Sequence, residues 1–322
     1  MNPQVIDPVA SVPPLVVIGG ATATGKTELA IRLAEAIERD GRPAWIISAD
    51  SRQVYRGLDI GTAKVSAADR ARVPHRGLDL IDPDQPFSVA DFAEHARGVL
   101  AEVAGIGGVA ILAGGTGLYL RAVGRGLDTA ALPSDREVRV RLEAELLAEG
   151  LEHLALRLRA TAPRTAARVD LRNPRRVIRA LEITELSGDE PLPEPRGYPG
   201  AAAWLGLNVE PKPHAERIAT RARSQFDAGL VEEARALRER FDPTLPAFSA
   251  IGYREAWAVI DGEQTREQAI ELDARRNVAF SKRQGTWFRA EPGITWLDAT
   301  GELPTTSAIE LVRETIEPVP TP

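Results

Sequence analysis

Residues 20–27 read Gly20-Ala21-Thr22-Ala23-Thr24-Gly25-Lys26-Thr27, between an apolar run (Leu15 to Ile18) and a helical pattern that begins at Glu28. The glycines let the chain turn its backbone N–H groups inward, and the N-terminus of the following helix adds partial positive charge. Lys26 supplies a cation and Thr27 a hydroxyl for Mg²⁺. Strand, loop and helix in this order predict a P-loop that binds a diphosphate or triphosphate.

Strands alternate with helices in the first third of the chain. Apolar runs at 15–18, 44–47 and 109–113 predict buried strands, and the patterns at 28–39 and 89–104 predict helices. This alternation indicates an α/β fold with a P-loop NTPase-like parallel sheet and helices on both faces.

After Gly126 the pattern becomes purely helical, until a Pro/Gly-rich stretch (188–200) and a further predicted strand, Ala203 to Asn208. Helices are expected at 134–148, 151–159, 163–169 and 174–186, the first with the capping-box spacing of Ser134 and Glu137. The expected segments are a flexible tail (1–14), the first part of the core (15–126), an inserted all-helical domain (127–199), the completion of the core with C-terminal helices (200–300) and a C-terminal extension (301–322) with a flexible Pro-rich end.

Composition narrows the class of protein. The absence of cysteine excludes disulfides and thiolate metal sites and fits the cytoplasm. The N-terminus lacks a basic signal-peptide region, and no apolar run has the length of a membrane helix, so no membrane partner is expected. The formal net charge of −6 argues against nonspecific coating of nucleic acid. The residues leave the oligomeric state open, and a monomer is the expectation.

Two basic runs stand out in this acidic chain. One lies between Arg157 and Arg179 and contains only Asp170 as an acid; the other runs from Arg275 to Arg289 without any acid. Either run alone is as compatible with a solvated helix face that forms salt bridges as with a surface that binds a polyanion. Together they favour a polyanionic partner, whose binding would depend on salt.

Two further strand ends carry polar residues where open α/β sheets bind ligands. The second strand is followed by Asp50, which is a candidate general base or, alternatively, a carboxylate that orients Mg²⁺ or caps a helix. The third strand ends in Gly114-Gly115-Thr116, with no acid at the Walker-B position. That absence weakens the ATPase interpretation.

These residues resemble a known family, the bacterial tRNA dimethylallyltransferases. The likeness spans residues of about 15 to 295 and rests on the P-loop, Asp50 to Lys64, Pro74-His75-Arg76, Phe87 to Phe92, Gly114 to Tyr119, Arg179 to Glu182, Ile251 to Glu255 and Lys282 to Arg289. The chain departs from the family at Ala21 and Thr24, where Pro and Ser are usual, and at Asp170 to Asn173, which replaces a frequent His-Pro-Asn-Asp.

The resemblance implies transfer of a dimethylallyl group from dimethylallyl diphosphate to N6 of adenine 37 in the tRNA anticodon arm, with the P-loop (Gly20 to Thr27) holding the diphosphate and Mg²⁺ on Thr27. It implies Asp50 as the general base, with Thr116 and Arg221 also catalytic. It assigns tRNA contacts to Asp50, Ser51, Arg52, Gln53, Thr116, Arg175, Arg176, Arg179, Gly252, Tyr253, Arg254, Lys282, Arg283 and Gln284.

Three alternatives remain open at this point. A small-molecule P-loop kinase would require ATP turnover and no Arg-rich insertion. A prenyltransferase acting on free adenine nucleotide would have no use for the insertion, and a non-enzymatic, nucleotide-gated RNA binder would need neither Asp50 nor Thr116 at the rim of the loop. His75 is as compatible with a structural role as with a catalytic one, and Leu181, Ile183 and Trp287 are expected in the core.

Overall fold

The computed structural model describes residues 12–129, 131–190 and 194–316. The chain forms two compact units: a sheet unit, which contains the described residues up to Gly126 and from Gly197 onward, and a helical unit, Leu127–Arg196. The helical unit starts at the expected residue and ends three positions before the expected boundary at 199. Most of the expected N-terminal tail and the Pro-rich C-terminal end lie outside the described residues.

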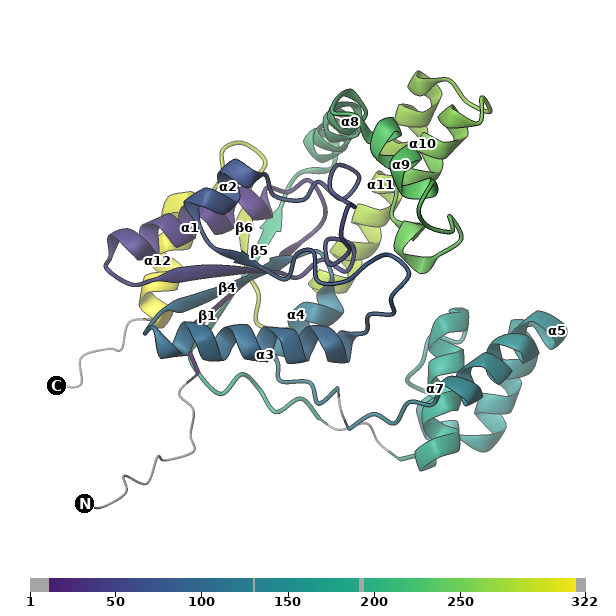
Figure 1. Cartoon of the computed structure of the whole chain (residues 1–322). Helices are drawn as coiled ribbons and strands as arrows, with labels where there is room; N and C mark the ends of the chain where they lie inside the picture. The colour runs from purple at the N-terminus through teal and green to yellow at the C-terminus, as the bar shows by residue number, and fades with distance from the viewer. Residues whose placement is uncertain (1–11, 130, 191–193, 317–322) are drawn as a thin grey trace, which may run out of the picture. The chain divides into compact units, whose positions relative to one another are not determined.

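The sheet unit is built on one six-stranded sheet in which every neighbouring pair is parallel (Figure 1). The strands are β1 (Leu15–Gly20), β2 (Ala44–Ser48), β3 (His75–Arg76), β4 (Val109–Gly114), β5 (Ala202–Asn208) and β6 (Thr295–Asp298). Their spatial order is β3-β2-β4-β1-β5-β6. The predicted parallel sheet is thereby confirmed, and the two short edge strands, β3 and β6, are additions that the sequence pattern did not indicate.

Helices cover both faces of the sheet, as predicted. The helices of the sheet unit are α1 (Lys26–Arg39), α2 (Ala67–Arg72), α3 (Val89–Gly105), α4 (Gly117–Gly124), α8 (Pro211–Asp227), α9 (Leu230–Arg238), η1 (Pro246–Ser249), α10 (Tyr253–Ile260), α11 (Arg266–Arg289) and α12 (Thr305–Ile316). In Figure 1, α1 and α12 lie on one face and α3 and α4 on the other. Each layer buries its apolar stripe against the all-apolar strands, which stabilises the sheet from both sides.

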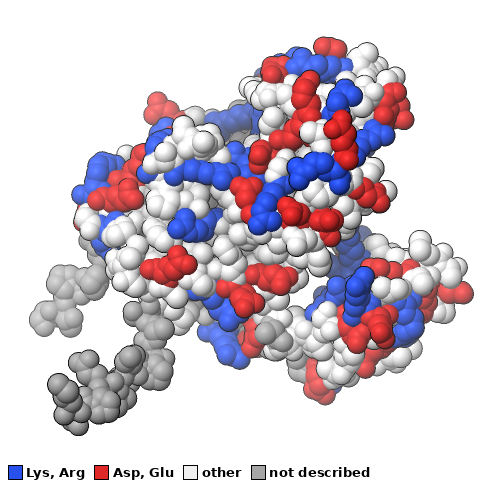
Figure 2. Space-filling view, in the orientation of Figure 1, with Lys and Arg blue, Asp and Glu red and all other residues white. Residues whose placement is uncertain are grey.

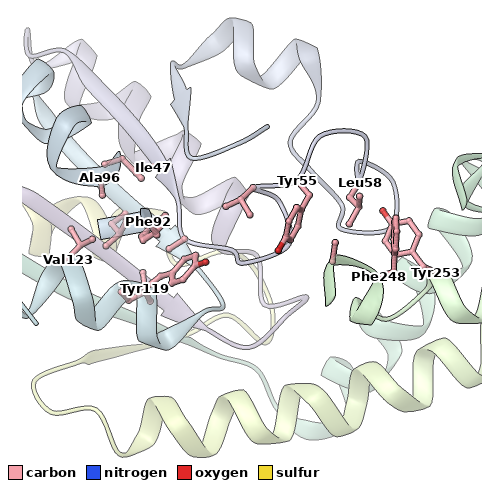
Figure 3. Close-up of a cluster of buried hydrophobic side chains, with 14 of the residues drawn as sticks. Ile47, Tyr55, Leu58, Phe92, Ala96, Tyr119, Val123, Phe248 and Tyr253 are labelled. Carbon is pink, nitrogen blue, oxygen red and sulfur yellow. The ribbon is translucent and has the colours of Figure 1, made fainter. Parts of the chain in front are cut away.

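The core on the α3 side extends from the sheet to the C-terminal helices. The rings of Phe92 and Tyr119 stack with centroids 4.0 Å apart. Figure 3 shows this group with Ile47, and a second group in which Leu58 lies near Phe248 and Tyr253. Because Tyr253 is fully buried here, α10 and the loop around Leu58 are held together by one apolar cluster.

The helical unit packs α5 (Arg136–Thr161) against α6 (Pro163–Ala166) and α7 (Pro174–Ser187) around its own apolar cluster, which includes Leu142, Leu158 and Val177. The expected division into helices at 134–148 and 151–159 is confirmed, because the run α5 is interrupted by a kink at Gly150, whose φ of 82° and ψ of 170° are not helical. The predicted capping box at Ser134 is wrong. The N-cap is Asp135, whose side chain accepts from the N–H groups of Glu137 and Val138.

We expect Gly114→Ala to destabilise the sheet unit by about 1 to 3 kcal/mol, because a Cβ there would lie 2.1 Å from the backbone oxygen of Ala49. Gly98→Ala is the matched control: this exposed position of α3 has no atom within 4 Å of an added Cβ, and the change should stabilise by about 0.5 to 1 kcal/mol. Urea unfolding of both variants measures the difference. Equal stabilities of the two variants would contradict the close approach of β2 and β4.

Candidate functional site

The P-loop has the backbone that its sequence predicts. Gly20, Ala23 and Gly25 have positive φ angles of 148°, 60° and 96°, so the chain turns sharply between β1 and α1. Ala21 lies at the centre of the internal contacts: its carbonyl oxygen accepts from Thr24 Oγ1 at 2.9 Å and from Lys26 Nζ at 2.5 Å. Thr27, the expected Mg²⁺ ligand, is exposed at the start of α1.

The charge of Lys26 is poorly compensated by the protein. Desolvation, with a further contribution from the charge of Arg221, lowers the pKa of Lys26 to about 7, while the charge of Asp50 acts in the opposite direction. Desolvation also lowers the pKa of Arg221, again opposed by Asp50. Two cations and one carboxylate are therefore within electrostatic reach of one another around the loop, an arrangement that an additional anion would stabilise.

Asp50 and Thr116 follow the ends of the neighbouring strands β2 and β4, and Thr116 bonds the residue after Asp50. Asp50 Oδ1 accepts from the N–H of Arg52 at 2.8 Å, and Thr116 Oγ1 accepts from the N–H of Ser51 at 3.0 Å. In the described chain the next helix after Asp50 is α2, which begins at Ala67, so the helix-capping alternative for Asp50 is wrong. The strand order places this pair on one side of the P-loop, at the same edge of the sheet.

Arg221 reaches the P-loop from α8. Its Nη1 donates to Thr22 Oγ1 at 2.8 Å and its Nη2 to the carbonyl oxygen of Thr62 at 3.4 Å. Gln53, an expected tRNA contact that is partly exposed, donates to the carbonyl oxygens of Thr62 and Ala63 and accepts from Ser48 Oγ. The loop at 59–63 thus connects Arg221 of α8 with Gln53, which follows β2, because both side chains donate to the carbonyl oxygen of Thr62.

The same loop is fixed from α9 by a residue that sequence reasoning missed. The carboxylate of Glu233 accepts from the backbone N–H groups of Asp59, Ile60 and Gly61 at 2.8 to 3.2 Å, and from the hydroxyl of Tyr253 at 2.8 Å. Gln225 donates to two carbonyl oxygens of the same loop. No local pattern indicates these contacts, since Glu233 lies more than 170 positions from the loop in sequence.

A pocket of about 750 Å³ opens beyond β5, next to the P-loop. Its wall includes Ala21 and Thr24 of the loop, apolar side chains such as Leu207 and Ile218, and the polar side chains of His214 and Lys282. Because β1 stands between β4 and β5, this pocket lies on the side of the P-loop opposite to Asp50 and Thr116. The P-loop therefore lies between this pocket, which has both apolar and polar walls, and the carboxylate of Asp50.

The residues expected to contact tRNA fall into two groups. Arg175, Arg176, Arg254, Lys282 and Arg283 are exposed. The others are partly or fully engaged within the protein. Besides Asp50, Ser51, Gln53 and Thr116, described above, this group contains Arg52, which bonds Pro246 and Ser249, and Arg179, which bonds buried Glu182 and the carbonyl oxygen of Pro133. It also contains Gln284, which bonds Thr22 and Gly115, and two buried residues, Gly252, whose N–H donates to Glu255, and Tyr253. The side chain of Tyr253 thus presents no surface to an RNA; it packs in the core and donates to Glu233.

Local charge is mixed on the surface. Figure 2 shows basic and acidic side chains interspersed over both units on the face it draws. In the helical unit, Glu182 is fully buried and its pKa is lowered because hydrogen bonds from Arg179 and Arg139 outweigh its desolvation. Arg179 of the first basic run therefore bonds a buried carboxylate of its own unit. By contrast, within the described residues no hydrogen bond or ion pair involves the side chains of Arg175 and Arg176.

The described residues contain no cluster of three or more His, Asp or Glu side chains that could hold a metal ion. None of the described helices has the combined length and apolar character needed to cross a bilayer.

The parallel sheet, with a P-loop that has the expected sharp turn between β1 and α1, places the chain among the P-loop α/β proteins. A family model described as IPP transferase matches residues 53–291. The chain is 39% identical to the tRNA dimethylallyltransferase of Symbiobacterium thermophilum, over 94% of this chain and 95% of that protein, and 41% identical to that of Thermus thermophilus, over 89% and 93%. The solved tRNA isopentenylpyrophosphate transferase of Bacillus halodurans is 37% identical, with a TM-score of 0.67 over 94% of this chain and 95% of that one. The chain belongs to the IPP transferase family.

We expect Glu233→Gln to destabilise the protein by about 1 to 3 kcal/mol, because the charged acceptor of three backbone N–H groups is lost. Glu232→Gln removes the same charge at the exposed neighbouring position and should change stability by less than about 0.5 kcal/mol. Denaturant unfolding compares the two. Equal effects would show that the loop at 59–61 does not depend on this carboxylate.

Proposed function

We propose that this protein transfers the dimethylallyl group of dimethylallyl diphosphate to N6 of adenine 37 in the tRNA anticodon arm and releases diphosphate. One observation carries the proposal: the carboxylate of Asp50, the hydroxyl of Thr116 and the P-loop follow the neighbouring strands β2, β4 and β1 at one edge of the sheet. Membership of the IPP transferase family, and relatives that are tRNA dimethylallyltransferases, support this assignment.

The diphosphate would bind to the inward N–H groups of the P-loop, with Lys26 and Arg221 as its cations. Both cations have lowered pKa values in the protein, so an anion between them relieves an existing electrostatic cost. Thr27 offers an exposed hydroxyl beside the loop, which suits Mg²⁺ that is bound mainly through phosphate oxygens and water. When bound, Mg²⁺ would supply further positive charge to the diphosphate.

The N6 lone pair is delocalised into the adenine ring, which makes N6 a weak nucleophile, and attack leaves N6 positively charged, so the transfer step requires a base. As N6 bonds to the allylic carbon, the bond between that carbon and the diphosphate oxygen breaks, and its electron pair leaves with the diphosphate. Asp50 accepts the proton that N6 loses. Thr116, which is bonded to the backbone beside Asp50, fixes this corner of the site.

The adenine must leave the anticodon loop to reach Asp50, so base extrusion is part of recognition. The exposed basic residues, Arg175 and Arg176 in the helical unit and Arg254, Lys282 and Arg283 in the sheet unit, are suited to contact tRNA phosphates. Phe280 is 38% exposed, with the guanidinium carbon of Arg283 5.7 Å from its ring centroid, and adds an aromatic surface for a base.

The first experiment incubates the protein with Mg²⁺ and radiolabelled dimethylallyl diphosphate, with unmodified tRNA, AMP or ATP as the acceptor. Label in tRNA alone supports the proposal. Label in AMP would assign the free nucleotide as substrate, and ATP consumption without label transfer would favour a kinase.

We predict that Asp50→Asn lowers kcat by about 10² to 10⁴ fold, because the amide cannot accept the N6 proton. The dissociation constant for tRNA should change by no more than a few fold. Single-turnover transfer and filter binding measure the two quantities separately. Unchanged turnover would remove Asp50 from the role of base.

We predict that the affinity for inorganic diphosphate falls with rising pH in the wild type more than in Lys26→Arg. The pKa of Lys26 is about 7 in the free protein, and a bound anion would keep the ammonium charged, so binding above pH 7 requires proton uptake. Arginine stays charged throughout, and the titration of diphosphate is common to both proteins. The ratio of the two dissociation constants should therefore shift by about tenfold between pH 6 and pH 8. A constant ratio in calorimetric titrations would contradict a titrating Lys26.

A further inference from the structure

Thr22 has all three of its polar groups bonded to side chains that are distant in sequence. Its N–H donates to Gln284 Oε1 at 2.9 Å, and its hydroxyl accepts from Arg221. Its carbonyl oxygen lies 2.7 Å from His214 Nε2, and since a carbonyl oxygen has no proton, His214 is the donor and carries its hydrogen on Nε2. Three side chains from α8 and α11 thus converge on one residue of the P-loop.

These contacts fix two peptide planes, because a trans peptide is planar and holds its C=O and N–H in opposite directions. The Thr22 N–H belongs to the plane whose other end is the Ala21 carbonyl, which accepts from Lys26 Nζ. The Thr22 carbonyl belongs to the plane whose other end is the N–H of Ala23. Gln284 therefore orients the group that holds Lys26, and His214 orients the Ala23 N–H.

The peptide plane that His214 holds, between Thr22 and Ala23, directly precedes the strained backbone of Ala23. Ala23 is a non-glycine residue with a φ of 60°, a conformation that an L-residue with a Cβ adopts only where its surroundings impose it. The imidazole donates to the carbonyl directly before this residue. His214 and Arg221 are seven positions apart, two helical turns, so they lie on the same face of α8.

The same contact is not needed for packing. His214 is partly exposed and lines the pocket beyond β5, whereas the apolar contacts of α8 are made by fully buried residues such as Ile218 and Phe226. A side chain present only to fill space would not need to donate a hydrogen bond into the loop.

We propose that His214 is a positioning residue for the diphosphate: by holding the Thr22 carbonyl, it aims the N–H of Ala23 at the phosphate oxygens. This inference rests on the proposed function in taking a diphosphate as the ligand of the loop. His214 does not touch the reacting atoms and acts through the peptide between Thr22 and Ala23. Gln284 performs the corresponding task for Lys26.

Three variants test the proposal. His214→Leu removes the donor, His214→Gln keeps an N–H donor, and Thr220→Leu, at an exposed position of the same helix, is the control for a general change in α8. The measurements are the calorimetric dissociation constant for inorganic diphosphate with Mg²⁺, the KM values for dimethylallyl diphosphate and for tRNA, and the thermal midpoint. His214→Ala replaces His214→Leu if the latter does not fold.

We expect His214→Leu to weaken diphosphate binding and to raise the KM for dimethylallyl diphosphate by about three- to tenfold, the effect of one lost hydrogen bond. The KM for tRNA should stay within about twofold, and His214→Gln should recover most of the loss. Unchanged diphosphate binding in His214→Leu, equal rises in both KM values, or a glutamine variant no better than leucine would overturn the proposal.

Two outcomes separate this inference from the proposed function. If the wild type binds diphosphate but transfers no label to tRNA, the proposed function fails while the ranking of the variants in calorimetry still decides the role of His214. If the wild type does not bind diphosphate at all, the positioning role is overturned as well.

Discussion

The site depends on the confinement of two cations, Lys26 and Arg221, around one loop. Desolvation lowers the pKa of both, and Asp50 compensates only part of their charge. Long-range contacts fix the P-loop despite this electrostatic cost. The loop follows β1, which pairs with β4 in the sheet, and Arg221 of α8 bonds Thr22 of the loop. A loop that is organised before its ligand arrives avoids reorganisation when charge develops on the leaving group.

Other contacts of the sheet unit hold the segment at 59–63, which lies between Arg221 and the chain that follows β2. Glu233, Gln225 and Gln53 bond the backbone at 59–63, which also accepts from Arg221. The buried ring of Tyr253 packs against this segment, where a Cβ on Gly61 would lie 2.5 Å from it. The C-terminal helices therefore hold the loop at 59–63, to which both Arg221 and Gln53 are bonded.

The sequence predicted what local patterns encode. The P-loop, the parallel strands of the core and the place of Asp50 at the sheet edge follow from motif and periodicity, and the structure has each of them. The contacts of Thr22 could not be predicted, because its partners lie 192 to 262 positions away. Ser134 was mistaken for a cap because Asp135, the next residue, has the same capping chemistry. Tyr253 was assigned from family likeness to a tRNA contact, and only the fold shows that it is buried.

The central claim is that the P-loop holds the diphosphate so that the allylic carbon faces Asp50. A crystal structure with Mg²⁺ and an unreactive thiolo analogue of dimethylallyl diphosphate tests it most directly. The account predicts the diphosphate inside the loop, contacted by Lys26, Arg221 and the N–H of Ala23, with the allylic carbon on the side of Asp50 and Thr116. An analogue whose diphosphate lies outside the loop, or whose allylic carbon points away from Asp50, would contradict it.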